Sequence, residues 1–280
     1  MSATVLTPVV EAPTDIASGD SAARRVWAWA WPKLLAIGLV LATWQIVVWS
    51  GWRPEYVLPG PAKVLGTLSD MVTTQRFWSS IATTLTRALF GFSLALVIGS
   101  ILGVLVARIR PLRLAAGALI TGLQTMPSIA WFPLAILLFG LNERAILFVV
   151  VLGAAPSIAN GVISGIDHVP PAFSRLGRVL GAGAIDQYRF IILPAALPSY
   201  VSGLTQGWAF AWRSLMAGEL LVIIAGRPSL GATLEFARQF SKADQLLATM
   251  LVVLIIGMLV DGVFSGASRR IRVRWGLTGA

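Results

Sequence analysis

Cysteine is absent from the 280-residue chain, and histidine occurs once, as His168. The sequence therefore excludes a disulfide framework, a thiolate nucleophile and a metal site built from cysteine and histidine. It also contains no GxxxxGK[ST] phosphate loop, no HExxH and no GxSxG. We accordingly expect no catalytic residue, no metal site and no cofactor held by this chain, and we do not expect an enzyme.

Charged residues are scarce as well. Only 12% of the residues are charged and 56% are hydrophobic, whereas a soluble domain carries about 25% charged residues. The formal charge of +10 would suggest nucleic acid as the partner of a soluble protein. Here the basic residues lie mostly at the ends of apolar runs, so we exclude nucleic acid and expect membrane lipids around the chain.

Long uncharged runs predict an all-α membrane protein. A helix needs about 20 apolar residues to cross a bilayer, and the runs give six transmembrane helices: Leu34–Ser50, Ala88–Ala107, Leu114–Leu141, Ala145–Ile166, Phe190–Trp212 and Leu246–Val260. Pro127 and Pro133 interrupt the third run, which we expect to be a kinked helix. The run Leu215–Ala225 is either the end of a long fifth helix or a short segment folded back into the membrane.

The distribution of basic residues predicts the topology. The clusters Arg108–Arg113 and Arg269–Arg274 directly follow predicted spans. Because cytoplasmic segments are enriched in Lys and Arg, both termini are expected in the cytoplasm of a multi-pass protein of the cell membrane. Residues 53–80 are then external, and the pattern from Val64 to Val72 predicts an amphipathic helix against the membrane face.

A few polar residues in or beside the spans are candidates for a translocation pathway. A charge near the bilayer centre costs at least about 2.5–3.5 kcal/mol, so Arg213 and Glu219 should face a cavity or a partner. Solute contact and structural pairing both remain open for them. Gln124 and Trp131 flank Pro127, where freed backbone could line a cavity or simply pack. For Arg87 we favour a side chain that reaches the outer headgroups.

The inner segment between the fourth and fifth spans predicts a hairpin. Pro170 and Pro171 suit the first turn of a short helix that runs to about Leu180. Gly181 and Gly183 would end this helix with a sharp turn before the chain enters the next span. A rigid, partly apolar protrusion toward the cytoplasm follows from this pattern.

This segment resembles the EAA loop of binding-protein-dependent ABC importer permeases. Gly181, Ile191, Leu193 and Pro194 fall at the spacing of that loop, and Arg175-Leu176-Gly177 occupy its Glu-Ala-Ala positions. Together with the fragment Tyr56–Pro61, the order of the motifs resembles the sulfonate, taurine, nitrate and bicarbonate branch of the family.

The resemblance implies the type I ABC importer permease fold, with a cytoplasmic tail at 1–32, a transmembrane permease domain at 33–268 and a second tail at 269–280. The coupling loop, at about 167–190, would meet ABC ATPase subunits that bind ATP and Mg. The implied ATPase-coupling residues are Arg175, Leu176, Gly177, Gly181, Ala182, Ile191, Leu193 and Pro194. An extracytoplasmic solute-binding protein and a second copy of the chain, in a homodimer, complete the implied partners.

The implied function is to form the translocation pathway for a small solute, an oxyanion such as an aliphatic sulfonate, taurine, nitrate or bicarbonate. The alternative is an ion-coupled secondary transporter. Such transporters usually contain internal repeats and broken helices in corresponding positions, and the sequence shows neither. An intramembrane enzyme would need catalytic pairs that are absent.

Overall fold

The computed structural model describes residues 22–274, and within that range all regular elements are helical. The chain divides into two units, residues 1–52 and residues 53–280. The predicted tails at 1–21 and 275–280 lie outside the described residues. Helix α1 (Ala22–Trp49) begins before the predicted tail boundary at residue 32, and α11 (Ala243–Arg274) continues past residue 268.

The first unit contributes one helix. In α1 the stretch Ala30–Trp49 is long and apolar enough to cross a membrane. Trp27 and Trp31 near one end and Trp49 at the other are exposed, as expected for indole rings at the two membrane–water interfaces. These features confirm the predicted first span by length and composition.

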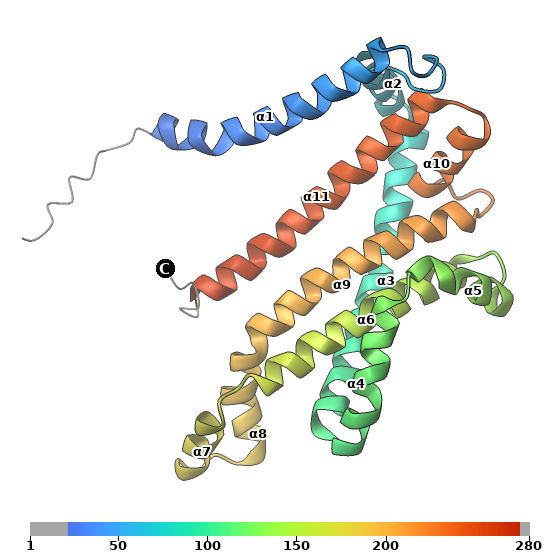
Figure 1. The fold of residues 1–280 in the computed structure, drawn as a ribbon. Helices are drawn as coiled ribbons and strands as arrows, with labels where there is room; N and C mark the ends of the chain where they lie inside the picture. Colours follow the sequence, from blue (N-terminus) through green and yellow to red (C-terminus); the bar gives the residue numbers. More distant parts are fainter. Residues whose placement is uncertain (1–21, 275–280) are drawn as a thin grey trace, which may run out of the picture. The chain divides into compact units, whose positions relative to one another are not determined.

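The second unit is a helical assembly that Figure 1 traces from α2 to α11. Its elements are α2 (Pro61–Val72), α3 (Gln75–Arg108), α4 (Arg110–Thr125), a 3₁₀ turn (Ser128–Trp131), α5 (Phe132–Phe139), α6 (Glu143–Asp167), α7 (Pro171–Val179), α8 (Ala184–Gln187), a π-helical turn (Tyr188–Ile192), α9 (Leu193–Leu221), α10 (Leu230–Gln239) and α11. Helix α6 packs against both α3 and α9 and forms the centre.

Small residues let these three central helices approach closely. A Cβ atom added at Gly99 of α3 would lie 2.6 Å from the Ala155 carbonyl oxygen of α6. One added at Gly161 of α6 would lie 2.7 Å from the Cα atom of Gly203 in α9. Because backbone stands in the way at both sites, no larger side chain fits without separating the helices. The helices α3, α6 and α9 therefore form one tightly packed core.

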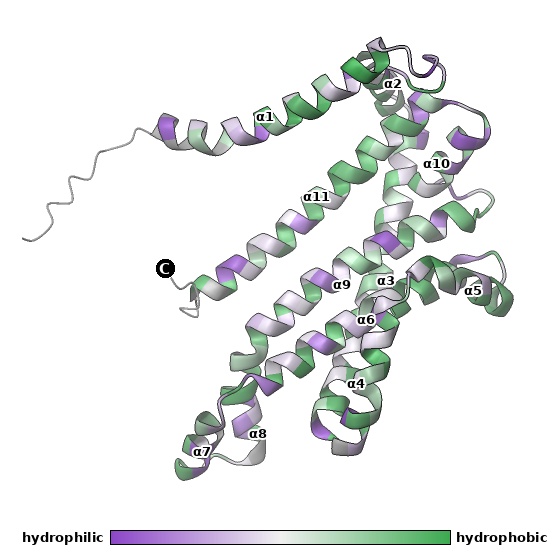
Figure 2. Ribbon diagram, in the orientation of Figure 1, coloured by the Kyte–Doolittle hydropathy of each residue, from purple (hydrophilic) through white to green (hydrophobic). Residues whose placement is uncertain are grey.

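The predicted spans are largely recovered. Helices α3, α6 and α11 are, with α1, long and apolar enough to cross a membrane, and the broken pair Pro111–Thr125 and Ser128–Phe139 adds a fifth if it counts as one span. The fifth predicted span, Phe190–Trp212, falls mostly within α9. This helix is 29 residues long, but polar residues recur along it (Figure 2), and its crossing stays a prediction.

The prediction that the third span is a single kinked helix is wrong. The two helices of this region are bent by 103° at their break. Pro127 lacks the N–H group that a continuing helix needs and restricts the residue before it, so Met126 is extended, with ψ 126°. The chain therefore turns sharply between α4 and α5.

The run left open, Leu215–Ala225, follows the first alternative over most of its length, as the end of a long helix. Helix α9 continues to Leu221, and the chain then leaves the helix and turns at Gly226, which has φ +74°. It returns as α10, which packs on α3, α9 and α11. The helix predicted from Val64 to Val72 is confirmed as α2, where Val64 is buried and Thr67 donates a hydrogen bond to Asp244 of α11 at 2.9 Å. Its external location stays a prediction.

Candidate functional site

The predicted hairpin between α6 and α9 is confirmed, and we call residues 167–193 the glycine hairpin. Helix α7 begins at Pro171, and Gly181 follows its last turn with φ +80°, a conformation that costs residues with a Cβ atom about 1–2 kcal/mol. Gly177 faces the returning chain, since an added Cβ would lie 2.5 Å from the Cδ1 atom of Ile191. The Ala182 amide donates to the Gly177 carbonyl at 2.9 Å and closes the turn.

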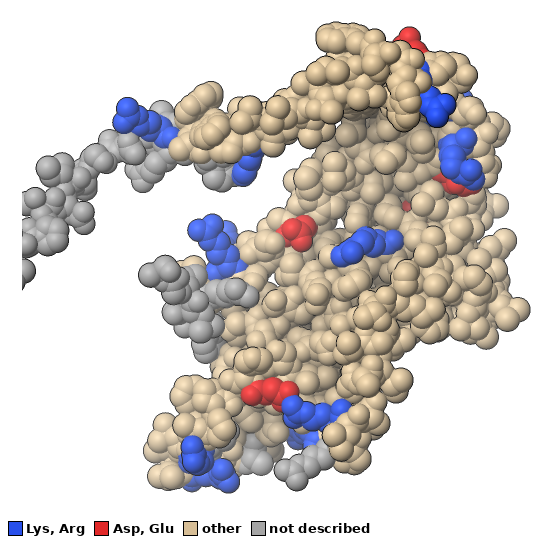
Figure 3. All heavy atoms as spheres, viewed as in Figure 1, with Lys and Arg blue, Asp and Glu red and all other residues tan. Residues whose placement is uncertain are grey.

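The outer surface of the glycine hairpin is apolar although it is exposed. Val179 is 83% exposed and Ile185 is 81% exposed, and Leu176, Leu180 and Leu193 are also exposed. Arg175 is exposed beside them, and Figure 3 shows basic side chains at this end of the molecule. A mixed surface of exposed aliphatic groups and arginine is typical of a protein interface.

Two contacts tie the base of the glycine hairpin to the helix core. The guanidinium carbon of Arg108, the last residue of α3, lies 3.8 Å from the ring centroid of Tyr188. Such a cation–π contact is worth about 0.5–1 kcal/mol at an exposed site. Arg113 in α4 forms an ion pair with Asp167 at the end of α6. These contacts link the base of the hairpin to α3, α4 and α6.

A polar cavity of about 490 Å³ lies between α6 and α9, close to the glycine hairpin. Its lining consists of Ser157, Asn160, Gly161, Ser164, Pro198, Ser199, Ser202, Gly203 and Gln206. Hydroxyl and amide groups dominate this lining, and none of these residues is charged or aromatic. We call it the polar cavity.

Of the predicted pathway residues, Gln124 adjoins the polar cavity. Its amide nitrogen donates to Ser157 Oγ at 3.1 Å, and its amide oxygen accepts from Asn160 Nδ2 at 2.9 Å. Trp131 lies apart from this group and packs against the main apolar core. Gln124 is thus not a lining residue, but from α4 it holds two of the lining residues in place.

Arg213 lies farther along α9, seven residues beyond Gln206, and so on nearly the same helix face. The side chain is exposed, its Nε atom donates to the Ala209 carbonyl at 3.0 Å, and its guanidinium lies over the Phe210 ring. Arg213 forms no ion pair with any described residue.

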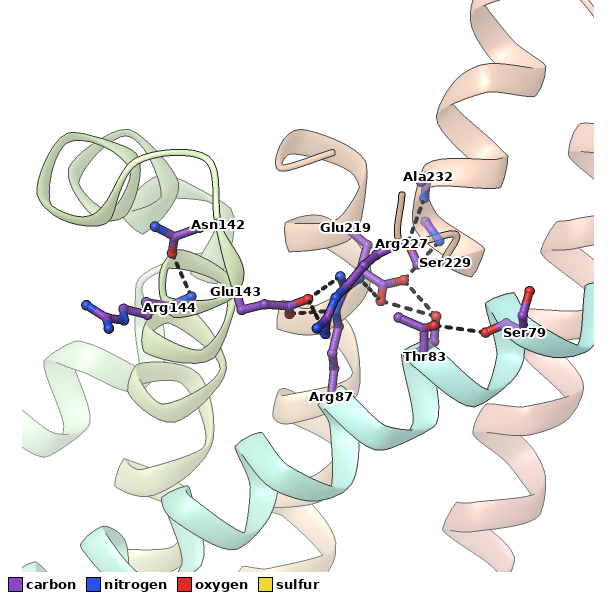
Figure 4. Close-up of polar contacts among 12 residues, drawn as sticks. Ser79, Thr83, Arg87, Asn142, Glu143, Arg144, Glu219, Arg227, Ser229 and Ala232 are labelled. Atoms are coloured by element: carbon purple, nitrogen blue, oxygen red, sulfur yellow. Dashed lines mark hydrogen bonds and ion pairs between the residues drawn. The ribbon is translucent and has the colours of Figure 1, made fainter. Parts of the chain in front are cut away.

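Glu219, the fourth predicted pathway residue, belongs to a charge cluster (Figure 4). It lies near the end of α9, whereas the glycine hairpin precedes the start of that helix. The Glu219 side chain is fully buried and accepts from Arg87 Nη1 at 2.9 Å, from Thr84 Oγ1 at 2.9 Å and from the Gly231 amide at 3.0 Å. Arg87 also donates from Nε and Nη2 to the carboxylate of Glu143, each at 2.7 Å. We call Thr84, Arg87, Glu143 and Glu219 the charge cluster.

The charge cluster corrects the hypothesis for Arg87. Its side chain is only 6% exposed and joins carboxylates from α6 and α9, so it does not reach out to headgroups. The same carboxylate of Glu219 bonds the first turn of α10. A Cβ at Gly231 would lie 2.3 Å from Glu219 Cβ, so glycine is required there.

Sequence reasoning missed Glu143 and most of the polar cavity. Glu143 stands at a helix start next to Arg144, and no local pattern pairs it with Arg87, which is 56 positions away. The polar cavity did leave a signal, since Ser199, Ser202 and Gln206 recur at helical spacing within a predicted span. The ATPase-coupling role of the hairpin residues and the pathway roles stay predictions.

Comparison with known proteins gives one family and several relatives. Residues 95–273 match the family described as binding-protein-dependent transport system inner membrane component. The putative aliphatic sulfonates transport permease protein SsuC of Escherichia coli K12 is 30% identical over 247 residues, which cover 87% of this chain and 91% of that protein. The riboflavin transport system permease protein RibX of Chloroflexus aurantiacus is 30% identical over 256 residues, covering 90% and 94%.

A solved structure shares the fold at lower sequence identity. A chain of a bacterial ABC transporter involved in the import of the acidic polysaccharide alginate superimposes with a TM-score of 0.59 at 14% identity. The match covers 88% of this chain and 99% of that one.

Proposed function

Because the chain belongs to the family of binding-protein-dependent transport system inner membrane components, with the fold of type I ABC importer permeases, we propose that it carries a small oxyanion inward with energy from a partner ATPase. The glycine hairpin is the docking site of that ATPase. A binding protein on the other side of the membrane delivers the solute, and a second copy of the chain completes the pathway.

The exposed apolar surface of the glycine hairpin supports the ATPase partner. Val179, Leu180 and Ile185 would leave aliphatic groups in water if nothing covered them. Burial of such side chains stabilises an interface by about 25 cal/mol per Å² of apolar area. The chain contains no phosphate loop of its own, so ATP hydrolysis must come from the protein that covers this surface.

The contacts at the base of the hairpin support the transmission of motion. Closure of two ATPase subunits is a rigid-body movement. Through Arg108–Tyr188 and Arg113–Asp167 a push on the hairpin reaches α3, α4 and α6 together. The tight packing of α6 against α3 and α9 then moves the core as one body rather than deforming one helix.

The lining of the polar cavity favours an oxyanion over a flavin. Riboflavin carries a large tricyclic ring, and proteins usually hold such rings against aromatic side chains. None of the residues that line the polar cavity is aromatic. Arg213, on the same face of α9, adds a positive charge that attracts an anion toward the pathway.

The test is reconstitution of the tagged chain in liposomes, alone and with the ATPase and binding protein that co-purify with it. We expect ATP-dependent uptake of a sulfonate, taurine, nitrate or bicarbonate only with the partners present. Uptake by the chain alone, driven by an ion gradient, would instead identify a secondary transporter. Uptake of riboflavin in preference to every anion would overturn the proposed solute class.

A further inference from the structure

Hydroxyl groups in the membrane-spanning helices divide into two kinds. Those of Thr121 and Thr205 donate to the carbonyl oxygen four residues earlier, at 3.1 Å and 3.0 Å, and Thr249 does the same at 2.8 Å. This is the usual way in which a hydroxyl is satisfied within a helix. These groups need no outside partner.

The α9 wall of the polar cavity differs. Among the described residues, Ser199, Ser202 and Gln206 have no hydrogen-bond partner for their side chains, although they lie in the same helix as Thr205. Ser202 and Gln206 are exposed and Ser199 is half-buried, so these three groups are open to water or to a solute.

The opposite wall is fixed. Asn160 donates to Gln124, and Gln124 donates to Ser157, so two helices hold these amides in one orientation. In this series of hydrogen bonds the Ser157 hydroxyl oxygen is the acceptor, so the hydroxyl hydrogen remains available for another partner. The polar cavity thus combines a prearranged wall with three side chains on α9 that are open to a ligand.

We propose that the polar cavity is a binding site for a weakly hydrated monoanion, a sulfonate or nitrate group, whose oxygen atoms accept hydrogen bonds from Ser199, Ser202 and Gln206. This inference rests on the proposed function and assigns the solute site within it. Oxygens of such groups only accept hydrogen bonds, and hydroxyl and amide groups donate them.

The absence of charge in the lining decides which anion fits. The solvation free energy that an ion loses on leaving water grows with the square of its charge, and no lysine or arginine in the lining compensates it. A monoanion is therefore admitted and a phosphate dianion is rejected. Binding by neutral donors is also weak enough for release, which a transport pathway requires.

Ser202 and Gln206 are the residues to change, because both are exposed and accessible to a reagent. They also line a neighbouring cavity between α9 and α11, which contains Asp261 and Arg269. The chain has no cysteine, so Ser202→Cys introduces a single reactive thiol. The complex with its ATPase and binding protein is treated with a neutral maleimide, with and without methanesulfonate, nitrate or phosphate. Thr121→Cys, outside the lining and with an internally bonded hydroxyl in the native chain, is the control.

We expect methanesulfonate and nitrate to slow labelling of Ser202→Cys at least about threefold, with no effect of phosphate and none on Thr121→Cys. Gln206→Leu should lower sulfonate uptake at saturating binding protein about tenfold, the factor of one hydrogen bond to a charged group, while the ATPase still co-purifies. Equal protection by phosphate, or no protection by any anion, would overturn the site. Protection without any ATP-driven uptake by the unaltered complex would support the site and reject the proposed function instead.

Discussion

The two ends of the α3–α6–α9 core each depart from the usual distribution, in which charged residues are exposed and apolar residues are buried. At one end the charge cluster buries an arginine and one carboxylate, with Arg87 only 6% exposed and Glu219 fully buried, while Glu143 is 31% exposed. At the other end the glycine hairpin exposes aliphatic side chains such as Val179. Buried charge and exposed hydrophobic surface both need an explanation, and the explanation differs between the two ends.

The charge cluster is complete within the chain. Arg87 forms a two-bond fork with Glu143 and a third bond with Glu219, while Thr84 and the Gly231 amide occupy the remaining carboxylate positions. Among the residues that the structure describes, the exposed apolar surface of the glycine hairpin has no such internal partner. The comparison is that one end is stabilised by the fold, whereas the other presents the surface at which we propose that a second protein docks.

The largest effect on stability is expected for a substitution in the charge cluster. Arg87→Ala leaves two carboxylates facing each other, one of them fully buried, and removal of one partner from a buried ion pair costs about 3–5 kcal/mol. Thermal unfolding in detergent measures the loss. Arg76→Ala, at an exposed position of the same helix, is the matched control and should change stability by no more than about 0.5 kcal/mol. Equal stability of the two variants would show that the cluster contributes nothing.

The next largest effect on stability is expected where α6 packs against α9, between the two ends of the core. Gly203→Ala places a Cβ 2.7 Å from the Cα atom of Gly161, and overpacking of this kind costs about 1–3 kcal/mol. Gly117→Ala in α4 meets nothing within 4 Å, so it should be neutral or stabilise by up to about 1 kcal/mol. The same unfolding assay compares them, and a stabilised Gly203→Ala variant would contradict the close packing of α6 on α9.

At the glycine hairpin a backbone change should have a smaller effect on stability. Gly181→Ala forces a Cβ atom into the left-handed region at a cost of about 1–2 kcal/mol. The strain is local, so limited proteolysis should cut the hairpin faster while the core helices stay protected. Unchanged cleavage at the hairpin would mean that its turn does not depend on Gly181.

A substitution in the exposed apolar surface of the glycine hairpin should have the smallest effect on stability. Its effect on assembly with the ATPase should be large. Leu176→Ser should change the unfolding free energy by no more than about 0.5 kcal/mol, since Leu176 is exposed. Co-purification of the ATPase should nevertheless fall about tenfold, as for an interface residue that loses about 1.4 kcal/mol of binding free energy. Full retention of the ATPase would show that this surface is not its docking site.

The glycine hairpin was predictable from sequence because its signals are local. Pro171 marks the start of α7, and Gly181 marks the turn after it, each through its own backbone preference. The helix was predicted to run to about Leu180 and ends at Val179. The sharp break at Pro127 was underestimated because the same residue type is compatible with a kink or with a turn.

The charge cluster was not predictable in the same way. Its bonds join Arg87 to residues 56 and 132 positions away, and helical periodicity carries no information on such pairings. Polar residues along α9 were visible in the sequence, but only the packing of α6 against α9 places them around one cavity.

The central claim is that the glycine hairpin, and not the opposite end, docks a nucleotide-hydrolysing partner. Because the native chain lacks cysteine, Val179→Cys and Phe240→Cys each provide one exposed thiol, at positions 83% and 69% exposed. Thiol cross-linking in native membranes should join Val179→Cys to an ATPase subunit and leave Phe240→Cys without one. An ATPase captured only at Phe240→Cys, or at neither position, would contradict the account.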